Sequence, residues 1–165
     1  MKKEVLIFLS TFDKKDASME EKTDFIIGQN EIYLDYEPLG EVFDYRKLPY
    51  NNPDGLKNFI LEKIKENQPK WIIGEGTSAT ILIGLKFPGR IMVNPKVSFE
   101  DLNNVLDYVR ESTFGFFDKY REKDYERFQS VYPNSAWYPE TSIDLSDLKP
   151  LIEGIINSDE ENGGN

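Results

Sequence analysis

The chain has 165 residues, and its 30 acidic and 20 basic side chains give a formal net charge of -10, which disfavours nucleic acid and anionic membrane surfaces as partners. The sequence contains no cysteine, which excludes a disulfide framework, and no histidine, which excludes a Ser-His-Asp triad. This length suits a single domain with one core. We expect one cytoplasmic domain over residues 1–157, followed by a disordered acidic tail over 158–165.

The first segments predict a strand and a helix. The apolar run Val5–Leu9 predicts a strand buried on both faces of a parallel sheet. It is too short for a signal-peptide core or a membrane span, so no membrane association is expected. Ser18 and Glu21 form a capping box, which predicts a helix over 19–27 that ends at Gly28.

The later segments continue this alternation. Residues 31–40 fit either a strand or a helical extension, and the pattern leaves both open. Further strands are expected at 41–46, 71–75, 90–94, 113–117 and 135–138, and further helices at 53–67, from 77, around 102–109, at 119–131 and at 145–156. We therefore predict an α/β fold, with a mostly parallel sheet of five or more strands and helices on both faces. Its ligand pocket should lie beyond the carboxyl ends of the strands.

The segment WIIGEGTSATILIGL, residues 71–85, predicts a strand, a tight glycine turn and a helix. Residues 74–79 match G-x-G-x-x-A, a pattern of dinucleotide-binding turns. That pattern is expected on the first strand of its unit, with an acidic residue ending the next strand, whereas this turn lies mid-chain and the next strand ends in Asn94. A Walker loop is excluded because the chain has no Gly-Lys-Ser/Thr sequence.

The order of these landmarks resembles the small α/β-hydrolase esterases of the YqiA type, over about residues 4–156. In that family the first strand ends in an oxyanion-hole turn, a Pro-Asp-Gly-like segment opens a helix, the elbow G-x-S-x-G carries the nucleophile, and an Asn-Pro pair ends the next strand. The matching segments are Ser10-Thr11-Phe12, Pro53-Asp54-Gly55, Gly74-Glu75-Gly76-Thr77-Ser78 and Asn94-Pro95. By the same resemblance, the segment FGFFD places Asp118 in the role of the triad acid.

The chain departs from this family at the catalytic positions. Gly76 stands in place of the elbow serine, Ser78 in place of its second glycine, and Ser10 in place of the histidine of the first turn. The segment 141–144, where the resemblance places the triad base, has no histidine. An elbow holds its central residue at positive φ, and glycine removes the resulting strain. We therefore expect positive φ at Gly76, in a turn that has kept its shape without its nucleophile.

The sequence is compatible with three functions. The first is a catalytically inactive hydrolase-like domain that binds a small ligand or a protein partner, in a pocket formed by Ser10, Thr11, Phe12, Gly74, Glu75, Gly76, Thr77, Ser78, Asn94 and Asp118. The second is a hydrolase with relocated chemistry, in which Ser10, Thr77 or Ser78 is the nucleophile and Asp118, Glu75 or Asp44 is a carboxylate base. The third is nucleotide binding through the glycine turn.

No cofactor or metal is predicted. Without histidine and cysteine only an oxygen-ligand ion such as magnesium or calcium would suit the chain, and the acidic residues Asp13, Asp16 and 122–126 are typical of a solvated surface. The aromatic residues of the last third could line a pocket or a homodimer face, although core packing is their commoner use. They are Tyr120, Tyr125, Tyr132, Trp137 and Tyr138.

Overall fold

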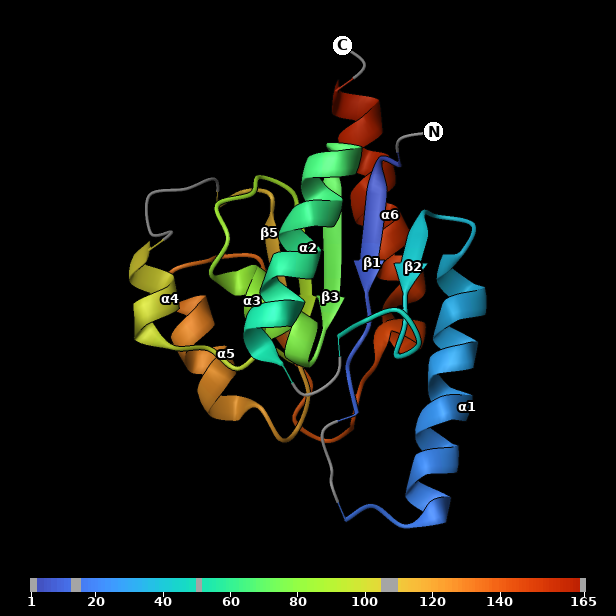
Figure 1. Cartoon of the computed structure of the whole chain (residues 1–165). Helices are drawn as coiled ribbons and strands as arrows, with labels where there is room; N and C mark the ends of the chain where they lie inside the picture. Colours follow the sequence, from blue (N-terminus) through green and yellow to red (C-terminus); the bar gives the residue numbers. More distant parts are fainter. Residues whose placement is uncertain (1–2, 13–15, 50–51, 105–109, 164–165) are drawn as a thin grey trace.

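A six-stranded parallel sheet forms the centre of the protein (Figure 1). The computed structural model describes residues 3–12, 16–49, 52–104 and 110–163, and the side chains up to residue 158. Within these residues the strand order is β2-β1-β3-β4-β5-β6, and all neighbouring strands are parallel. The strands are β1 Val5–Phe8, β2 Glu41–Phe43, β3 Trp71–Glu75, β4 Arg90–Val93, β5 Thr113–Phe117 and β6 Ser135–Trp137. The predicted α/β class is confirmed.

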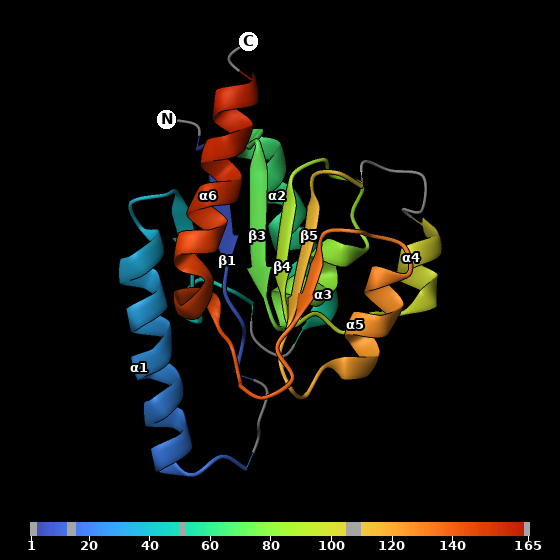
Figure 2. The same cartoon turned by 180° about the vertical axis from the view of Figure 1, so that it is seen from behind.

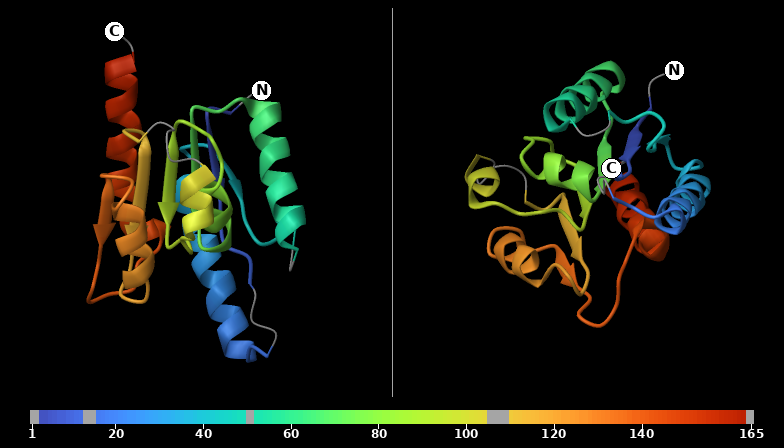
Figure 3. Two further views of the ribbon diagram at one scale, coloured as in Figure 1. Left: turned by 90° about the vertical axis from the view of Figure 1, so that its left-hand side faces the viewer. Right: turned by 60° about the horizontal axis from the view of Figure 1, so that its bottom comes forward.

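Helices cover both faces of the sheet (Figures 2 and 3). They are α1 Met19–Tyr36, α2 Pro53–Asn67, α3 Thr77–Ile83, α4 Phe99–Asn104, α5 Glu122–Gln129 and α6 Leu145–Gly163. Buried residues of α1 and α6 share one core cluster, and buried residues of α2, α3, α4 and α5 share the other. The sheet is therefore the middle of three layers, which is the arrangement that a parallel sheet requires.

Strand β1 shows why its sequence is apolar throughout. Leu6 and Phe8 belong to the core cluster under α2 and α3, whereas Val5, Ile7 and Leu9 belong to the cluster under α1 and α6. Successive side chains of a strand point to opposite faces, so both sets must be apolar when both faces are covered.

Helix α1 is longer than the prediction of 19–27. It continues to Tyr36 and passes through Gly28, so residues 31–36 are helical. Its buried residues Gln29, Ile32 and Tyr36 recur at helical spacing and face the sheet. Packing of that face outweighs the cost of a glycine in a helix interior, which is about 1 kcal/mol.

Strand β2 is shorter than predicted and ends at Phe43. The chain turns at Asp44, which is fully buried and accepts from the guanidinium of Arg46, with Nη2 and Oδ2 at 2.6 Å. Asp44 Oδ1 also accepts from the Arg46 amide at 3.0 Å. A side chain that binds its own backbone two residues on forms a turn, which ends the strand.

The helix predicted over 53–67 is confirmed at both ends. Asn52 caps it by accepting from the Gly55 amide at 3.0 Å, and Gln68 ends it in a left-handed conformation with φ of 49°. The helix expected around 102–109 corresponds to α4, and Val105, Leu106 and Val109 lie outside the described residues.

Helix α6 passes the predicted end at 156 and continues to Gly163. It therefore includes most of the tail that was expected to be disordered. Extending a formed helix adds one hydrogen bond for each residue that is fixed, without a new nucleation step. Amino-acid composition alone does not predict this extension of the helix.

The buried cation Arg90, at the amino end of β4, binds the end of α3, the start of β5 and Tyr132 in the loop after α5. Its Nη1 donates to the carbonyls of Leu82 and Ile83, at 3.1 and 3.0 Å, at the end of α3. Its Nη2 donates to Thr113 Oγ1 and Tyr132 Oη, both at 3.2 Å. A positive charge at a helix carboxyl end is also favourable for the helix dipole.

We expect Arg90→Met to lower the free energy of unfolding by about 2–4 kcal/mol, because it leaves buried carbonyl and hydroxyl groups without their donor. Tyr132→Phe removes one of these bonds and should cost about 1 kcal/mol. Urea denaturation monitored by circular dichroism measures both values. Equal stability of Arg90→Met and the wild type would contradict this account.

Candidate functional site

The candidate site lies at the carboxyl ends of the central strands β1 and β3. After β1 the chain crosses to α1 on one face of the sheet, and after β3 it turns into α3 on the other face. Adjacent parallel strands whose connections leave in opposite directions open a crevice between their ends, and ligands of α/β proteins bind there. Ser10 and Thr11 follow β1, and Gly76 and Thr77 follow β3.

The turn at Gly76 is sharp and has a positive φ, as predicted. Its φ is 58° and its ψ is -120°, a combination that side chains rarely adopt. A Cβ atom at this position would lie 2.6 Å from Ser10 Oγ and 3.1 Å from Ser10 Cβ. Glycine therefore suits this position for two reasons: the backbone conformation favours it, and the Ser10 side chain occupies the space where a side chain of residue 76 would project.

The hydroxyl groups next to this turn join the two loops. Ser78 is fully buried, and its Oγ donates to the Leu9 carbonyl at 2.7 Å. Thr77 Oγ1 accepts from the Thr11 amide at 3.0 Å and lies 3.2 Å from Thr11 Oγ1. The Ser78 hydroxyl and the Thr11 amide are thus engaged in holding the β1 loop against α3.

Asp118, the candidate acid, lies at the end of β5 and is 7% exposed. Its Oδ2 accepts from Asn94 Nδ2 at 3.2 Å, its Oδ1 accepts from the Tyr120 amide at 3.0 Å, and its own amide donates to Asn94 Oδ1 at 2.9 Å. Asn94 has a left-handed backbone with φ of 55° and also donates to the Ile143 carbonyl at 3.2 Å. This pair connects the ends of β4 and β5 with the loop before α6.

Glu75, at the end of β3, is partly buried beside the start of α6. Its Oε2 accepts from the Leu145 amide at 2.9 Å. Burial raises the pKa of Glu75 to about 7, the Leu145 amide opposes this shift, and the nearby Asp144 and Asp147 add to it. A carboxyl group with this pKa changes its charge near neutral pH.

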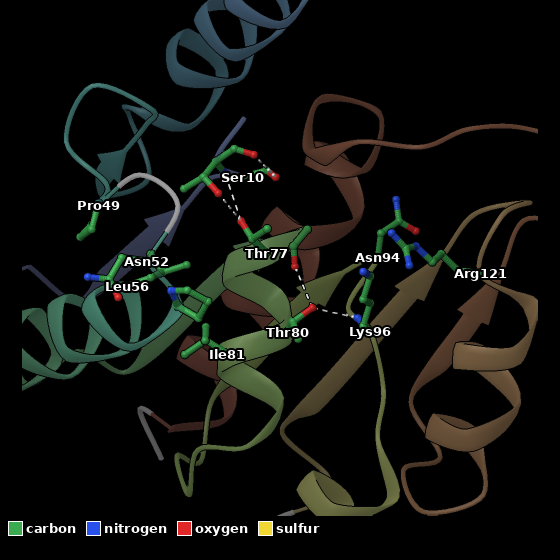
Figure 4. A pocket seen from close by; sticks show the side chains of 13 residues that line it. Ser10, Pro49, Asn52, Leu56, Thr77, Thr80, Ile81, Asn94, Lys96 and Arg121 are labelled. Carbon is green, nitrogen blue, oxygen red and sulfur yellow. Dashed lines mark hydrogen bonds between the residues drawn. The ribbon is translucent and has the colours of Figure 1, made fainter. Parts of the chain in front are cut away.

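Two adjoining cavities open over these residues, and Figure 4 shows the larger one. The larger has a volume of about 530 Å³ and is lined by Ser10, Thr11, Pro49, Asn52, Pro53, Leu56, Gly76, Thr77, Thr80, Ile81, Asn94, Lys96 and Arg121. The smaller, of about 250 Å³, is lined by Ser10, Glu75, Gly76, Asn94, Asp118, Tyr120, Arg121 and Ile143. Ser10, Gly76, Asn94 and Arg121 border both.

Most of the predicted pocket residues line one of these cavities, and three do not. Phe12 packs on Phe25 of α1, with ring centroids 4.8 Å apart. Gly74 allows α3 to approach β3, because a Cβ there would lie 2.6 Å from Leu82 Cδ1. Ser78 is buried beneath the turn. Close packing therefore accounts for the first glycine of the G-x-G-x-x-A pattern.

Several lining residues were missed by sequence reasoning. They are Pro49, Asn52, Pro53, Leu56, Thr80, Ile81, Lys96, Arg121 and Ile143. Lys96 and Arg121 come two and three residues after the recognised Asn94 and Asp118, respectively. Their position in loops that follow strands could have indicated them, because parallel strands bring these loops to one edge of the sheet.

Several of the other candidate residues have structural roles, and Tyr120 lies at the surface. Asp44, a possible base, is held by Arg46. Tyr132 is fully buried, and Tyr125 stacks on Trp137 with an interplanar angle of 19°. Tyr120 is 74% exposed and borders the smaller cavity.

The remaining aromatic candidate, Tyr138, packs against the core cluster under α1 and α6. Asp13 lies outside the described residues. Within the described ranges no group of three or more acidic residues is arranged to hold a metal ion.

Gly76→Ala should lower the free energy of unfolding by about 1–3 kcal/mol, because alanine is strained at this φ and its Cβ meets Ser10. Adding Ser10→Gly should recover part of the loss, since it removes the contact and leaves the backbone strain. Gly28→Ala is a matched control, since a Cβ there has no atom within 4 Å, and it should stabilise α1 by about 0.5–1 kcal/mol. Chemical denaturation measures the free energy of unfolding of all three variants. A Gly76→Ala variant as stable as the wild type would refute the positive φ at residue 76.

Glu75→Gln tests the raised pKa of Glu75. Between its ordinary pKa and about 7, the folded protein holds this proton more tightly than the unfolded chain does, so wild-type stability falls as pH rises through that range. Glutamine keeps an acceptor for the Leu145 amide and has no proton to lose. The variant should therefore gain stability relative to the wild type with rising pH, by about 1–3 kcal/mol at about pH 8.

Urea denaturation at several pH values measures this difference. The exposed Glu140→Gln is the control and should show no such trend. A constant difference between Glu75→Gln and the wild type across this range would overturn the assigned pKa.

Comparison with known proteins adds no family to this geometry. No protein-family model matches the chain, and no curated protein matches it. In the described part of the chain, no helix is long and apolar enough to cross a membrane.

Proposed function

We propose that this protein is a catalytically inactive α/β-hydrolase-like domain that binds a small molecule above the Gly76 turn. The observation that carries the proposal is that a cavity of about 530 Å³ opens over a sharp turn in which Gly76 has a φ of 58°. A cavity of this volume falls in the usual range of small-molecule sites. It also lies at the crevice where α/β proteins bind ligands.

Loss of catalysis is supported by the chemistry of the hydroxyl groups. The elbow position holds glycine, and the Ser78 hydroxyl donates to a backbone carbonyl at 2.7 Å. The sequence has no histidine to take a proton from a serine. Asp118, the counterpart of the triad acid in the resemblance, binds Asn94 and the Tyr120 amide.

The wild type should therefore neither hydrolyse p-nitrophenyl acetate above background nor react with a fluorophosphonate probe. The triple variant Ser10→Gly, Gly76→Ser, Ile143→His should show measurable hydrolysis. Gly76→Ser supplies a nucleophile, Ile143→His supplies a base beside the cavity that Asp118 borders, and Ser10→Gly makes space for the new serine. Ser10→Gly with Gly76→Ser alone, and Ser10→Gly with Ile143→His alone, should stay inactive. Hydrolysis by the wild type would refute the proposal.

A second candidate function is hydrolysis by Ser10, with Glu75 as the general base. Two observations favour it. Ser10 Oγ lies 2.6 Å from the place where the Cβ of a side chain at position 76 would stand, so this hydroxyl is next to the position of an elbow nucleophile. Ser10 and Glu75 also line the same small cavity. Burial brings the pKa of Glu75 to about 7, which suits a general base at neutral pH. Ser10 Oγ would attack the ester carbonyl and pass its proton to the Glu75 carboxylate. The protonated Glu75 would then give that proton to the alcohol that leaves as the ester C–O bond breaks, and water would hydrolyse the resulting acyl-serine.

This candidate predicts fluorophosphonate labelling of the wild type at Ser10. Labelling should be lost in Ser10→Ala and should rise with pH through about 7 in the wild type, as the carboxylate forms. Glu75→Gln should remove that pH dependence and leave only slow labelling. Mass spectrometry of the labelled peptide measures both effects, and an unlabelled Ser10 would eliminate this candidate.

A further inference from the structure

The two cavities differ in charge. Among the described residues, those lining the larger cavity include Lys96 and Arg121 and no aspartate or glutamate. The carboxylates Glu75 and Asp118 border only the smaller one. Acidic side chains outnumber basic ones by 30 to 20 in the chain, so a lining with two cations and no acid runs against the overall composition.

Lys96 is placed at the cavity by α3. Its backbone amide donates to Thr80 Oγ1 at 2.9 Å, and that hydroxyl donates to the Gly76 carbonyl at 3.2 Å. The residue is exposed, and in the part of the chain that the structure describes no ion pair involves its ammonium group. Its charge is therefore available to a ligand.

Arg121 comes to the same end of the cavity from the turn before α5. Its Nη1 lies 3.6 Å from Asp124 Oδ2, and Asp124 Oδ1 also accepts from the Val97 amide at 2.8 Å. The Arg121 guanidinium has further N–H donors, so the pair with Asp124 leaves donors that a ligand can use. In Figure 4 Lys96 and Arg121 both extend toward Asn94.

The other end of the cavity is mainly apolar. Pro49, Pro53, Leu56 and Ile81 line it together with Asn52, and Leu56 is contributed by α2 and Ile81 by α3. The hydroxyls of Thr77 and Thr80 lie between this wall and the cationic end in Figure 4. A ligand that fits both ends has a charged head and a short apolar body.

We propose that the larger cavity binds a small organic anion, with a carboxylate or phosphate monoester head at Lys96 and Arg121 and a short apolar body against Leu56 and Ile81. This inference rests on the proposed function, because it names the ligand class of the same site. The net charge of -10 does not prevent it. Screening weakens the interaction between exposed charges beyond about 8 Å at physiological ionic strength, so distant acidic residues contribute little at the head group.

Hexanoate, hexyl phosphate and hexanol are suitable probes, because they share one apolar body and differ in the head group. Titration of the ¹⁵N-labelled full chain, followed by amide chemical shifts, reports both affinity and location. We expect hexanoate or hexyl phosphate to shift the amides of Thr77, Lys96 and Arg121 and to bind at least about tenfold more tightly than hexanol. The stronger of the two anions identifies the head group.

Two variants separate the ends of the cavity. Lys96→Gln should weaken the binding of the anion by about tenfold and leave that of hexanol unchanged, and added salt should reproduce part of this loss. Lys119→Gln, the control, removes the same charge from an exposed residue outside the lining and should leave the affinity unchanged. Ile81→Ala should weaken the binding of all three probes.

The outcomes distinguish this inference from the proposed function. Equal binding of hexanoate, hexyl phosphate and hexanol at these amides would overturn the anion inference and retain a small-molecule site. Equal losses in Lys96→Gln and Lys119→Gln would also overturn it, because the effect would then come from net charge. If no probe shifts these amides at millimolar concentration, both the inference and the proposed small-molecule function fail.

Discussion

The contact between the β1 loop and the turn after β3 determines the shape of the candidate site. The Thr11 amide donates to Thr77 Oγ1 at 3.0 Å, and Ser78 Oγ donates to the Leu9 carbonyl at 2.7 Å. Buried backbone groups at strand ends need partners, and here the side chains of α3 supply them. These two bonds hold Ser10 over Gly76, so the residue at position 76 can have no side chain unless Ser10 moves.

The same contact explains how hydroxyl groups near an elbow-like turn can be structural. A hydroxyl that donates to a buried carbonyl leaves that carbonyl unsatisfied if it turns away, at a cost of about 1–3 kcal/mol. Ser78 is in this situation, and Thr77 supports the Thr11 amide in a similar way. Ser10, which borders both cavities and donates weakly to the Thr11 carbonyl at 3.3 Å, is the hydroxyl with the most freedom.

The division of charge between the cavities follows from which loops border them. The smaller cavity receives Glu75 and Asp118 from the ends of β3 and β5, together with the loop before α6. The larger one receives the loop after β4, with Lys96, and the amino end of α2. Arg121 borders both cavities and pairs with Asp124, with Nη1 and Oδ2 3.6 Å apart.

The sequence by itself determined the fold class, the identity of the central strands and the turn at Gly76. These features depend on local patterns, because an apolar run needs two covered faces and a glycine between a strand and a helix permits positive φ. It did not reveal that α1 continues through Gly28, since that depends on how Gln29, Ile32 and Tyr36 pack on the sheet. It also did not reveal that Lys96, Arg121 and Ile81 line one cavity. Residues from α2, α3 and the loops after β4 and β5 meet only when the parallel strands bring their carboxyl ends to one edge, so only the tertiary structure decided which of them share a cavity.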